Sequence, residues 1–133
     1  MWNDLGKYIA SSWDKNSKTR FKVVEIAIGK FFGVSNYLKT CQNIDLLMTD
    51  ISPANDRITK DDITNPNLSL YDHAKIIYSI RPPSELQPFL GKLANKTRAI
   101  LIVKPFFNED LNTGKKMKLI NYKKAVFYQY EPK

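Results

Sequence analysis

The sequence predicts an α/β domain in which helices cover both faces of a mostly parallel sheet and an antiparallel hairpin lies at one edge. Short apolar runs rich in β-branched residues alternate with helical or turn segments, as in strands buried on both faces: 22–28, 44–51, 75–80 and 98–103. Two further β-rich segments, 117–122 and 125–130, are joined through Lys123-Lys124, as in a hairpin. With 133 residues and 43% hydrophobic content, residues 1–133 are expected to form a single domain.

The chain is expected to begin with an amphipathic helix. Trp2, Leu5, Ile9 and Trp13 recur at spacings of three, four and four residues, which places them on one helical face. The polar segment Lys15–Arg20 would end this helix. We expect the apolar face to pack on the sheet rather than to bind a partner helix.

The first strand, 22–28, leads into Gly29, and a short helix is expected after Gly33. Doubly wound sheets bind nucleotides at such a turn, because it brings backbone N–H groups and a helix N-terminus to the ligand. The first position of a full glycine fingerprint is Ala27, however, and the third is Phe32 or is displaced to Gly33. The pattern disfavours a dinucleotide but allows a ligand that needs one close backbone approach.

The second strand, 44–51, contains Asp50 and is broken by Ser52-Pro53. A very short third strand is expected within 58–63, with Asp61 and Asp62 at its end. About six residues separate Asp50 from Arg57, whereas a helical crossover between parallel strands usually needs ten or more. Either this crossover is cut down to a loop, or the third strand is vestigial.

The fourth strand, 75–80, is stopped by Arg81-Pro82-Pro83. Ser84 with Gln87 three residues later is a capping-box pattern, which predicts a helix from about Ser84 to Asn95. The fifth strand, 98–103, ends at Lys104.

Charge and composition restrict the class of protein. The longest clear apolar run, residues 99–103, is far too short to cross a membrane, and the single cysteine, Cys41, fits a reducing cytoplasm. The net charge is +8, and residues 91–133 carry ten Lys or Arg against three Asp or Glu. This asymmetry predicts a basic surface in the last third, either for an anionic partner such as RNA or as a solvated face without a partner.

Ligands of open parallel sheets bind beyond the carboxyl ends of the strands. The residues expected there are Gly29, Lys30, Asp50, Asp61, Asp62, Ser79, Arg81, Pro82 and Lys104. Asp50 lies 21 residues after Gly29, where a ribose-binding carboxylate belongs, although a turn-forming role also fits. Glu25, inside an apolar strand, requires either a basic partner or an amino group of a ligand.

Other chemistries are disfavoured. His73 is the single histidine, and no repeated metal-ligand spacing accompanies it, so no metal site is expected. A Ser/His/Asp hydrolase would need His73 as its base, yet this residue precedes the fourth strand, away from the carboxyl edge.

The predicted hairpin combines lysines with aromatic residues. Lys115, Lys116, Lys118, Lys123 and Lys124 interleave with Tyr122, Phe127, Tyr128 and Tyr130. Such a mixture can bind RNA through phosphate contacts and base stacking, but alternating aromatics more often pack across strands.

The run V-V-E-I-A-I-G, with acids at Asp50 and Asp61-Asp62, resembles the class I S-adenosylmethionine-dependent methyltransferases, which have a Rossmann-like fold. The resemblance implies that Glu25, Ala27, Gly29, Lys30 and Ser79 lie at a cofactor site. It further implies that Asp50 binds ribose and that Asp61 or Asp62 binds adenine. The run from Asp61 to Gln87, above all I-Y-S-I-R-P-P-S-E-L-Q, resembles a small archaeal family, uncharacterised protein family 0146.

Three departures from the methyltransferase pattern leave two alternative functions open. Ala27 replaces a loop glycine, and the helix after the second strand is missing. Many amino-group methyltransferases carry Asn/Asp-Pro-Pro-aromatic after the fourth strand, whereas this chain has Arg81-Pro82-Pro83-Ser84, so Arg81, Pro82 and Lys104 suggest an anionic substrate. The sequence therefore predicts either a methyltransferase-like protein that acts on RNA or another anion, or a non-catalytic module that binds nucleic acid or a protein partner.

Overall fold

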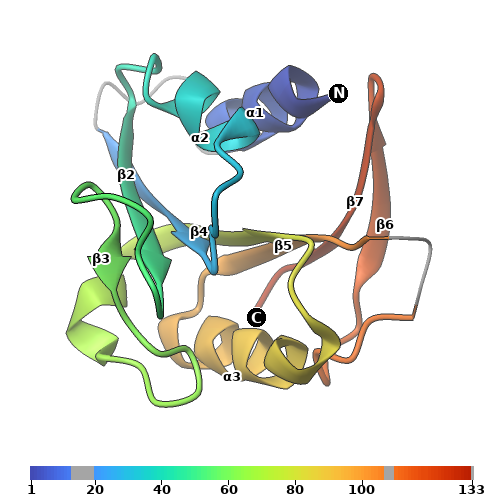
Figure 1. Cartoon of the computed structure of the whole chain (residues 1–133). Coiled ribbons are helices and arrows are strands. Elements are labelled where there is room, and N and C mark those ends of the chain that lie inside the picture. Colours follow the sequence, from blue (N-terminus) through green and yellow to red (C-terminus); the bar gives the residue numbers. More distant parts are fainter. Residues whose placement is uncertain (13–19, 107–109, 133) are drawn as a thin grey trace.

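The computed structural model describes residues 1–12, 20–106 and 110–132, and within these residues seven strands form one sheet (Figure 1). The strands are β1 (Phe21–Ile26), β2 (Ile44–Asp50), β3 (Thr59–Lys60), β4 (Ala74–Ile80), β5 (Ile100–Lys104), β6 (Lys118–Tyr122) and β7 (Ala125–Tyr130). Their order in the sheet is β3-β2-β1-β4-β5-β7-β6. Strands β1 to β5 pair in parallel, and β7 runs antiparallel to both β5 and β6. The predicted mostly parallel sheet with a C-terminal antiparallel hairpin is confirmed.

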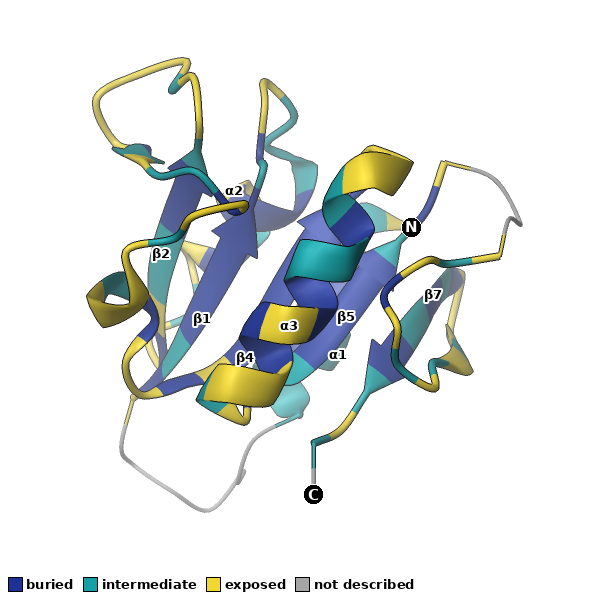
Figure 2. Cartoon of the chain, turned by 90° about the horizontal axis from the view of Figure 1, so that it is seen from below, coloured by how far each residue is buried: buried dark blue, intermediate teal, exposed yellow. Residues whose placement is uncertain are grey.

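Helices cover both faces of the sheet, as predicted. Helices α1 (Trp2–Ser11) and α2 (Gly33–Leu38) lie on one face, and α3 (Gln87–Thr97) lies on the other (Figures 1 and 2). Every helix in the described residues is too short or too polar to span a bilayer. The predicted apolar face of α1 is confirmed for Leu5 and Ile9, which are 1% and 0% exposed. Trp13 and residues 15–19 of the segment expected to end this helix lie outside the described residues.

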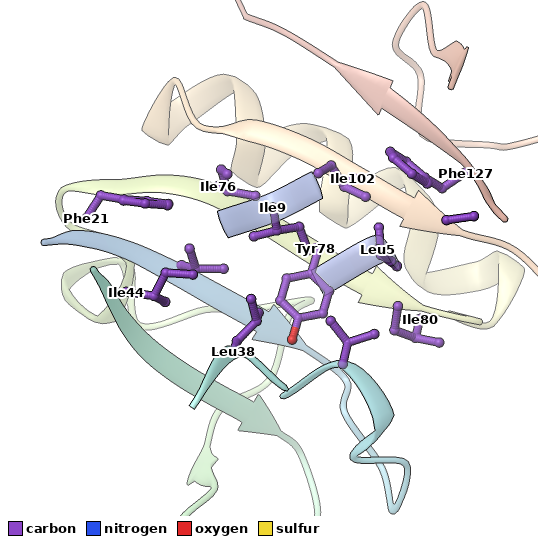
Figure 3. Packing of buried hydrophobic residues seen from close by; sticks show 13 residues of the cluster. Leu5, Ile9, Phe21, Leu38, Ile44, Ile76, Tyr78, Ile80, Ile102 and Phe127 are labelled. Carbon is purple, nitrogen blue, oxygen red and sulfur yellow. The ribbon is translucent and has the colours of Figure 1, made fainter. Parts of the chain in front are cut away.

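The core consists of two apolar layers, one on each side of the sheet. Between the sheet and the helices α1 and α2, side chains from β1, β4 and β5 meet Leu5, Ile9 and Leu38 (Figure 3). On the other face, Leu90, Leu93 and Ala94 of α3 pack on the opposite side chains of the same strands. Both faces of the central strands are therefore buried, which explains why these strands read as nearly continuous apolar runs.

The connection between β2 and β3 contains no helix within the described residues 51–58, and β3 has two residues. The truncated crossover predicted from the short spacing is confirmed, although the strand is shorter than the predicted range 58–63. Ile58 and Ile63, which flank it, are both buried, so these apolar residues pack as loop anchors rather than extending the strand.

The predicted capping box at Ser84 is wrong. Residues Ser84–Leu86 form a short 3-10 turn (η2), α3 begins at Gln87, and no side chain caps either start. The buried Gln87 instead accepts a hydrogen bond from the Asn112 N–H at 2.7 Å and donates to the Pro82 carbonyl at 3.5 Å. Pro88 favours a helix start at this point, because proline is tolerated in the first turn. The Gln87 side chain therefore joins the strand-four turn to the segment that leads to the hairpin.

Gly91→Ala is expected to destabilise the protein by about 1–3 kcal/mol, although alanine is normally the better helix former. The cause is a steric clash, because a Cβ on Gly91 would lie 1.9 Å from the carbonyl oxygen of Thr113, in a segment that packs on α3. Thermal or urea unfolding of the variant measures the effect, with Lys92→Ala, one residue away and exposed, as the control. An unchanged or increased stability of Gly91→Ala would contradict this close packing.

Candidate functional site

The loop that follows β1 takes the backbone conformation of a glycine-rich turn. Gly29 has a φ of +59°, and Ala27 has a φ of +57°, in the left-handed region that a side chain disfavours. The N–H of Ile28 donates to the Thr49 carbonyl at 3.2 Å, which holds the loop against β2. The chain then reaches α2 at Gly33. Replacement of a glycine by Ala27 therefore does not prevent this loop conformation.

Ala27→Gly is expected to stabilise the protein by about 0.5–1 kcal/mol, because it removes the steric cost of a left-handed alanine while adding some entropy to the unfolded chain. Chemical unfolding measures this change. Ala10→Gly, in α1, provides the control, since glycine there should destabilise by about 1 kcal/mol. A loss of stability in Ala27→Gly would show that Ala27 is not strained.

Asp50 connects the ends of the first two strands. Its Oδ2 accepts a hydrogen bond from the Gly29 N–H at 2.8 Å, and its Oδ1 accepts one from the Ser52 N–H at 2.9 Å. Of the two roles left open by the sequence, the turn-forming role is therefore present in the structure. A carboxylate offers about four lone-pair positions, so Asp50 retains capacity for further donors. The glycine turn and the acid predicted to bind ribose are in direct contact.

Asp61 and Asp62 follow β3 and differ in how their carboxylates are used. Asp61 accepts hydrogen bonds on both oxygens, from the Asn67 N–H at 3.0 Å and from the Tyr71 hydroxyl at 2.5 Å. Asp62 accepts from the hydroxyl and the N–H of Thr64 on the same oxygen, and these bonds lower the pKa of Asp62 below its usual value. The Oδ2 of Asp62 accepts no hydrogen bond from the part of the chain that the structure describes. Asp61 therefore organises the loop, and Asp62 keeps one carboxylate oxygen that is not used in the loop.

These residues line one cleft at the carboxyl ends of β1, β2 and β3. Its volume is about 240 Å³, and its walls are formed by Ile26, Ala27, Thr49, Asp50, Ile51, Asp61, Asp62, Ile63, Pro83 and Leu86. Ile26 and Leu86 belong to the apolar layer beneath α3, so the cleft opens on that side of the sheet. The site combines apolar walls with three carboxylates, each of which accepts at least one hydrogen bond from a backbone N–H.

Glu25 and Ser79 lie inside the sheet rather than in the wall of this cleft. Ser79 is fully buried, and its hydroxyl donates to the Ile26 carbonyl at 2.7 Å. Glu25 is 1% exposed and accepts a hydrogen bond from the Tyr78 hydroxyl at 2.5 Å, a partner that the sequence did not indicate. Burial raises the pKa of Glu25 to about 8, although that hydrogen bond and the charge of Lys39 oppose the shift. The side chain is thus a neutral acid at pH 7, which removes the need for a cation.

The predicted basic residues of this edge lie around the ends of β1, β4 and β5. Lys30 is exposed, Lys104 is half-buried, and Pro82 is buried beside the turn. The N–H of Arg81 donates to the Lys104 carbonyl at 2.6 Å, and its φ is +53°. The sequence suggests an anionic substrate at Arg81, and this stays a prediction. Among the described residues, its guanidinium contacts aromatic rings.

Three aromatic residues that the sequence did not single out for the site surround Arg81. The guanidinium carbon lies 5.1 Å from the ring centre of Trp2, 5.7 Å from that of Phe31 and 5.4 Å from that of Phe106. No local pattern could have found them, because they come from α1, the loop after β1 and the segment after β5. The sequence offers one hint, the position of Arg81 at the end of a predicted strand.

A larger hollow of about 620 Å³ lies at the opposite edge, at the amino ends of β1, β2 and β4. Its lining includes Arg20, Lys22, Asp72 and His73. The Lys22 ammonium in this lining is already bonded within the protein, since it donates to the carbonyls of Leu70 at 2.5 Å and Asp72 at 3.2 Å. His73 lies at this edge, away from the glycine turn, as its position before β4 predicts.

Comparison with known sequences supports one family. A family model described as uncharacterised protein family (UPF0146) matches residues 2–132. A UPF0146 protein of Methanothermobacter thermautotrophicus is 44% identical over 130 residues, covering 98% of this chain and 95% of its own. A UPF0146 protein of Archaeoglobus fulgidus is 34% identical and covers 93% of this chain and 90% of its own.

Comparison with solved structures supports the fold. A proposed S-adenosyl-L-methionine-dependent methyltransferase of Methanococcus maripaludis has a TM-score of 0.61 at 11% identity, covering 98% of this chain and 84% of its own. The antibiotic-resistance methyltransferase Kmr has a TM-score of 0.60 at 10% identity and covers 87% and 89% of the two chains. CalS10 is an amino pentose methyltransferase of Micromonospora echinaspora that was solved with S-adenosylmethionine bound. It has a TM-score of 0.58 at 9% identity, and the alignment covers 92% of this chain and 59% of CalS10. The chain therefore has a methyltransferase-like, Rossmann-like fold.

Proposed function

The chain belongs to the uncharacterised protein family UPF0146, and from its fold and the geometry of its cleft we propose that it binds S-adenosylmethionine or a related adenosine ligand. The contact between the Asp50 carboxylate and the Gly29 N–H, 2.8 Å long, carries this proposal. It joins the glycine turn after β1 to the acid after β2 at the lip of one cleft. Ligand sites of open parallel sheets occupy this position.

Each part of the cleft has a role in this proposal. Asp50 accepts ribose hydroxyls on the lone pairs left by its two backbone donors, and Asp62 accepts the adenine amino group on its free oxygen. Ile26 and Leu86 offer apolar surface to the adenine ring. The cleft, at about 240 Å³, is below the usual range for sites that enclose a whole drug-sized ligand, so it would hold the adenosine part and leave the remainder at the open edge.

As an enzyme, the protein would transfer a methyl group to RNA or to another anionic substrate. The ligand would supply an activated methyl group, and this chain would supply placement, which can provide a large part of a rate enhancement. Arg81 and Lys104, with Pro82 shaping the turn between them, would hold the anion at the same edge of the sheet as the cleft. Their hydrogen-bonded contact at 2.6 Å fixes the two strand ends relative to each other.

A second function, a non-catalytic module for nucleic acid or a protein partner, is favoured by one observation. Residues 51–58 form a loop where the methyltransferase pattern has a helix, so one wall of the cofactor pocket is reduced. The basic last third of the chain would then provide the binding surface.

Calorimetric titration with S-adenosylmethionine and with S-adenosylhomocysteine separates the two functions. Saturable heat with either ligand supports the adenosine site, and S-adenosylhomocysteine isolates binding from turnover. No heat at millimolar ligand, together with salt-sensitive RNA binding, favours the module. Lys123→Ala, in the hairpin and far from the cleft in the sheet order, should leave any heat of binding unchanged.

A further inference from the structure

A cation held on aromatic rings lies at the end of β4, on the side of the sheet covered by α1 and α2. The Arg81 guanidinium lies over Trp2, Phe31 and Phe106, and the Trp2 and Phe31 rings meet edge to face with centres 4.7 Å apart. We refer to these four residues as the Arg81 platform. Because its members come from four separate segments, the fold assembles the platform.

The backbone of Arg81 is fixed in a conformation that costs free energy. Its φ of +53° lies in the left-handed region, which residues other than glycine disfavour. The 2.6 Å bond from its N–H to the Lys104 carbonyl holds this turn. Such strain persists where the surroundings determine it, and it concentrates at functional sites. The direction in which the Arg81 side chain leaves the backbone is therefore set before any ligand arrives.

The platform remains accessible to solvent. Phe106 is 63% exposed, Arg81 is exposed, and Trp2 and Phe31 are half-buried. An arginine stacked on rings keeps its N–H groups in the guanidinium plane, where they can bind phosphate in a bidentate manner. The exposed ring of Phe106 beside it offers a stacking surface for a base. A base and its phosphate are the pair of groups that this combination suits.

The predicted hairpin surface is less suited to stacking. Phe127 is fully buried, and the Tyr8 ring of α1 packs edge to face on both Phe127 and Tyr122, with centres 4.8 and 5.4 Å apart. Phe127 and Tyr122 are therefore used in packing between α1 and the sheet, whereas Tyr128 and Tyr130 are half-buried. The hairpin keeps its exposed lysines, including Lys118 and Lys123, but the fully buried ring of Phe127 cannot receive a base.

We propose that the Arg81 platform binds single-stranded nucleic acid, with an unpaired base stacked on Phe106 and its phosphate held by Arg81. Lys30 and Lys104, at the ends of β1 and β5, extend the positive charge along the same edge. This inference rests on the proposed function, since it identifies the anionic substrate and places it at the same edge of the sheet as the cleft, on the face covered by α1 and α2. Duplexes are excluded by chemistry, because stacking on a side chain requires a base that is free of its partner.

The test measures fluorescence anisotropy of a labelled, unstructured 12-nucleotide RNA, the DNA of the same sequence and a duplex, each with the full chain at one fixed salt concentration. Phe106→Ala removes the ring and keeps every charge, and we expect it to weaken single-strand binding about tenfold. Arg81→Lys keeps the charge but loses the planar fork, and we expect a loss of several-fold. Lys118→Ala removes one exposed hairpin charge and should change affinity less than about twofold.

Three results would refute nucleic-acid binding by the Arg81 platform. They are no single-strand binding at low salt, equal affinity for the duplex, and a loss of affinity in Lys118→Ala as large as in Phe106→Ala. Comparison of the RNA and DNA arms identifies which strand is preferred. Because Phe106 is largely exposed, its variant should unfold at the wild-type temperature, and this is checked first. If Phe106→Ala weakens single-strand binding but S-adenosylmethionine gives no heat, the platform is supported and the adenosine site is refuted. If S-adenosylmethionine gives saturable heat but Phe106→Ala leaves single-strand binding unchanged, only the platform is refuted.

Discussion

Glu25→Gln is expected to remove most of the pH dependence of stability between about pH 5 and pH 8. Burial raises the pKa of Glu25 from 4.5 to about 8 in the folded protein, so the folded state holds a proton that the unfolded state has released. Each pH unit in this window then costs about 1.4 kcal/mol of unfolding free energy, as linkage requires. From pH 5 to pH 7.5, the wild type should lose about 3 kcal/mol through this residue alone.

The sign follows from the direction of the shift. A raised pKa means that Glu25 contributes fully below pH 4.5, where both states are protonated, and that the contribution is lost as the pH rises toward 8. Glutamine has no charge to bury and retains an oxygen that accepts the Tyr78 hydroxyl. Glu25→Gln should therefore be more stable than the wild type at pH 7.5 and similar to it at pH 5.

Urea unfolding of both proteins at several pH values measures the difference in slope. Glu85→Gln, an exposed carboxylate in η2, is the matched control and should follow the wild type at every pH. If Glu25→Gln and the wild type lose stability in parallel as the pH rises, Glu25 is charged in the folded protein and a cation compensates it after all.

Asp50→Ala is expected to weaken S-adenosylhomocysteine binding by at least tenfold. The variant loses the proposed ribose acceptor, and it leaves the N–H groups of Gly29 and Ser52 without their carboxylate. Hydrogen bonds to a charged group contribute about 1.5–3 kcal/mol each, so the glycine turn should also loosen and the protein should be less stable. Calorimetry measures the binding, and unfolding measures the stability.

Two further variants separate ligand recognition from folding. Asp50→Asn keeps one acceptor oxygen, so it should preserve most of the stability of the protein while still lowering its affinity for S-adenosylhomocysteine. Asp45→Ala removes the same charge from the opposite end of β2, where the side chain is exposed, and should affect neither measurement strongly. Wild-type affinity in a folded Asp50→Ala protein would refute the role of this carboxylate in ribose binding.

The strands and their ends could be predicted from the sequence, because apolar runs and the residues that stop them are local features. The apolar runs end at Gly29, Asp50 and Arg81, and the structure brings these strand ends to one edge. The short spacing after Asp50 correctly excluded a crossover helix. Turns and breaks of this kind depend on neighbouring residues, so no long-range information is required.

The contacts within the site could not be read in the same way, because they join distant residues. The partner of Glu25 is Tyr78, 53 positions away, and its hydroxyl is visible in the sequence only as one aromatic in an apolar strand. The direction of the Arg81 side chain depends on a left-handed backbone. Gln87 does not cap a helix, because its side-chain oxygen accepts a hydrogen bond from the Asn112 N–H. In each case tertiary contacts outweighed a local preference.

The ¹H–¹⁵N spectrum of the labelled protein, titrated with S-adenosylhomocysteine, tests the adenosine site most directly. We expect the largest shifts at the amides of Gly29, Asp50 and Asp62, since these groups form or border the cleft. Asp50→Ala should remove those shifts. An unchanged spectrum at millimolar ligand, or shifts gathered around Lys22 and His73 at the opposite edge, would contradict binding of adenosine at the glycine turn.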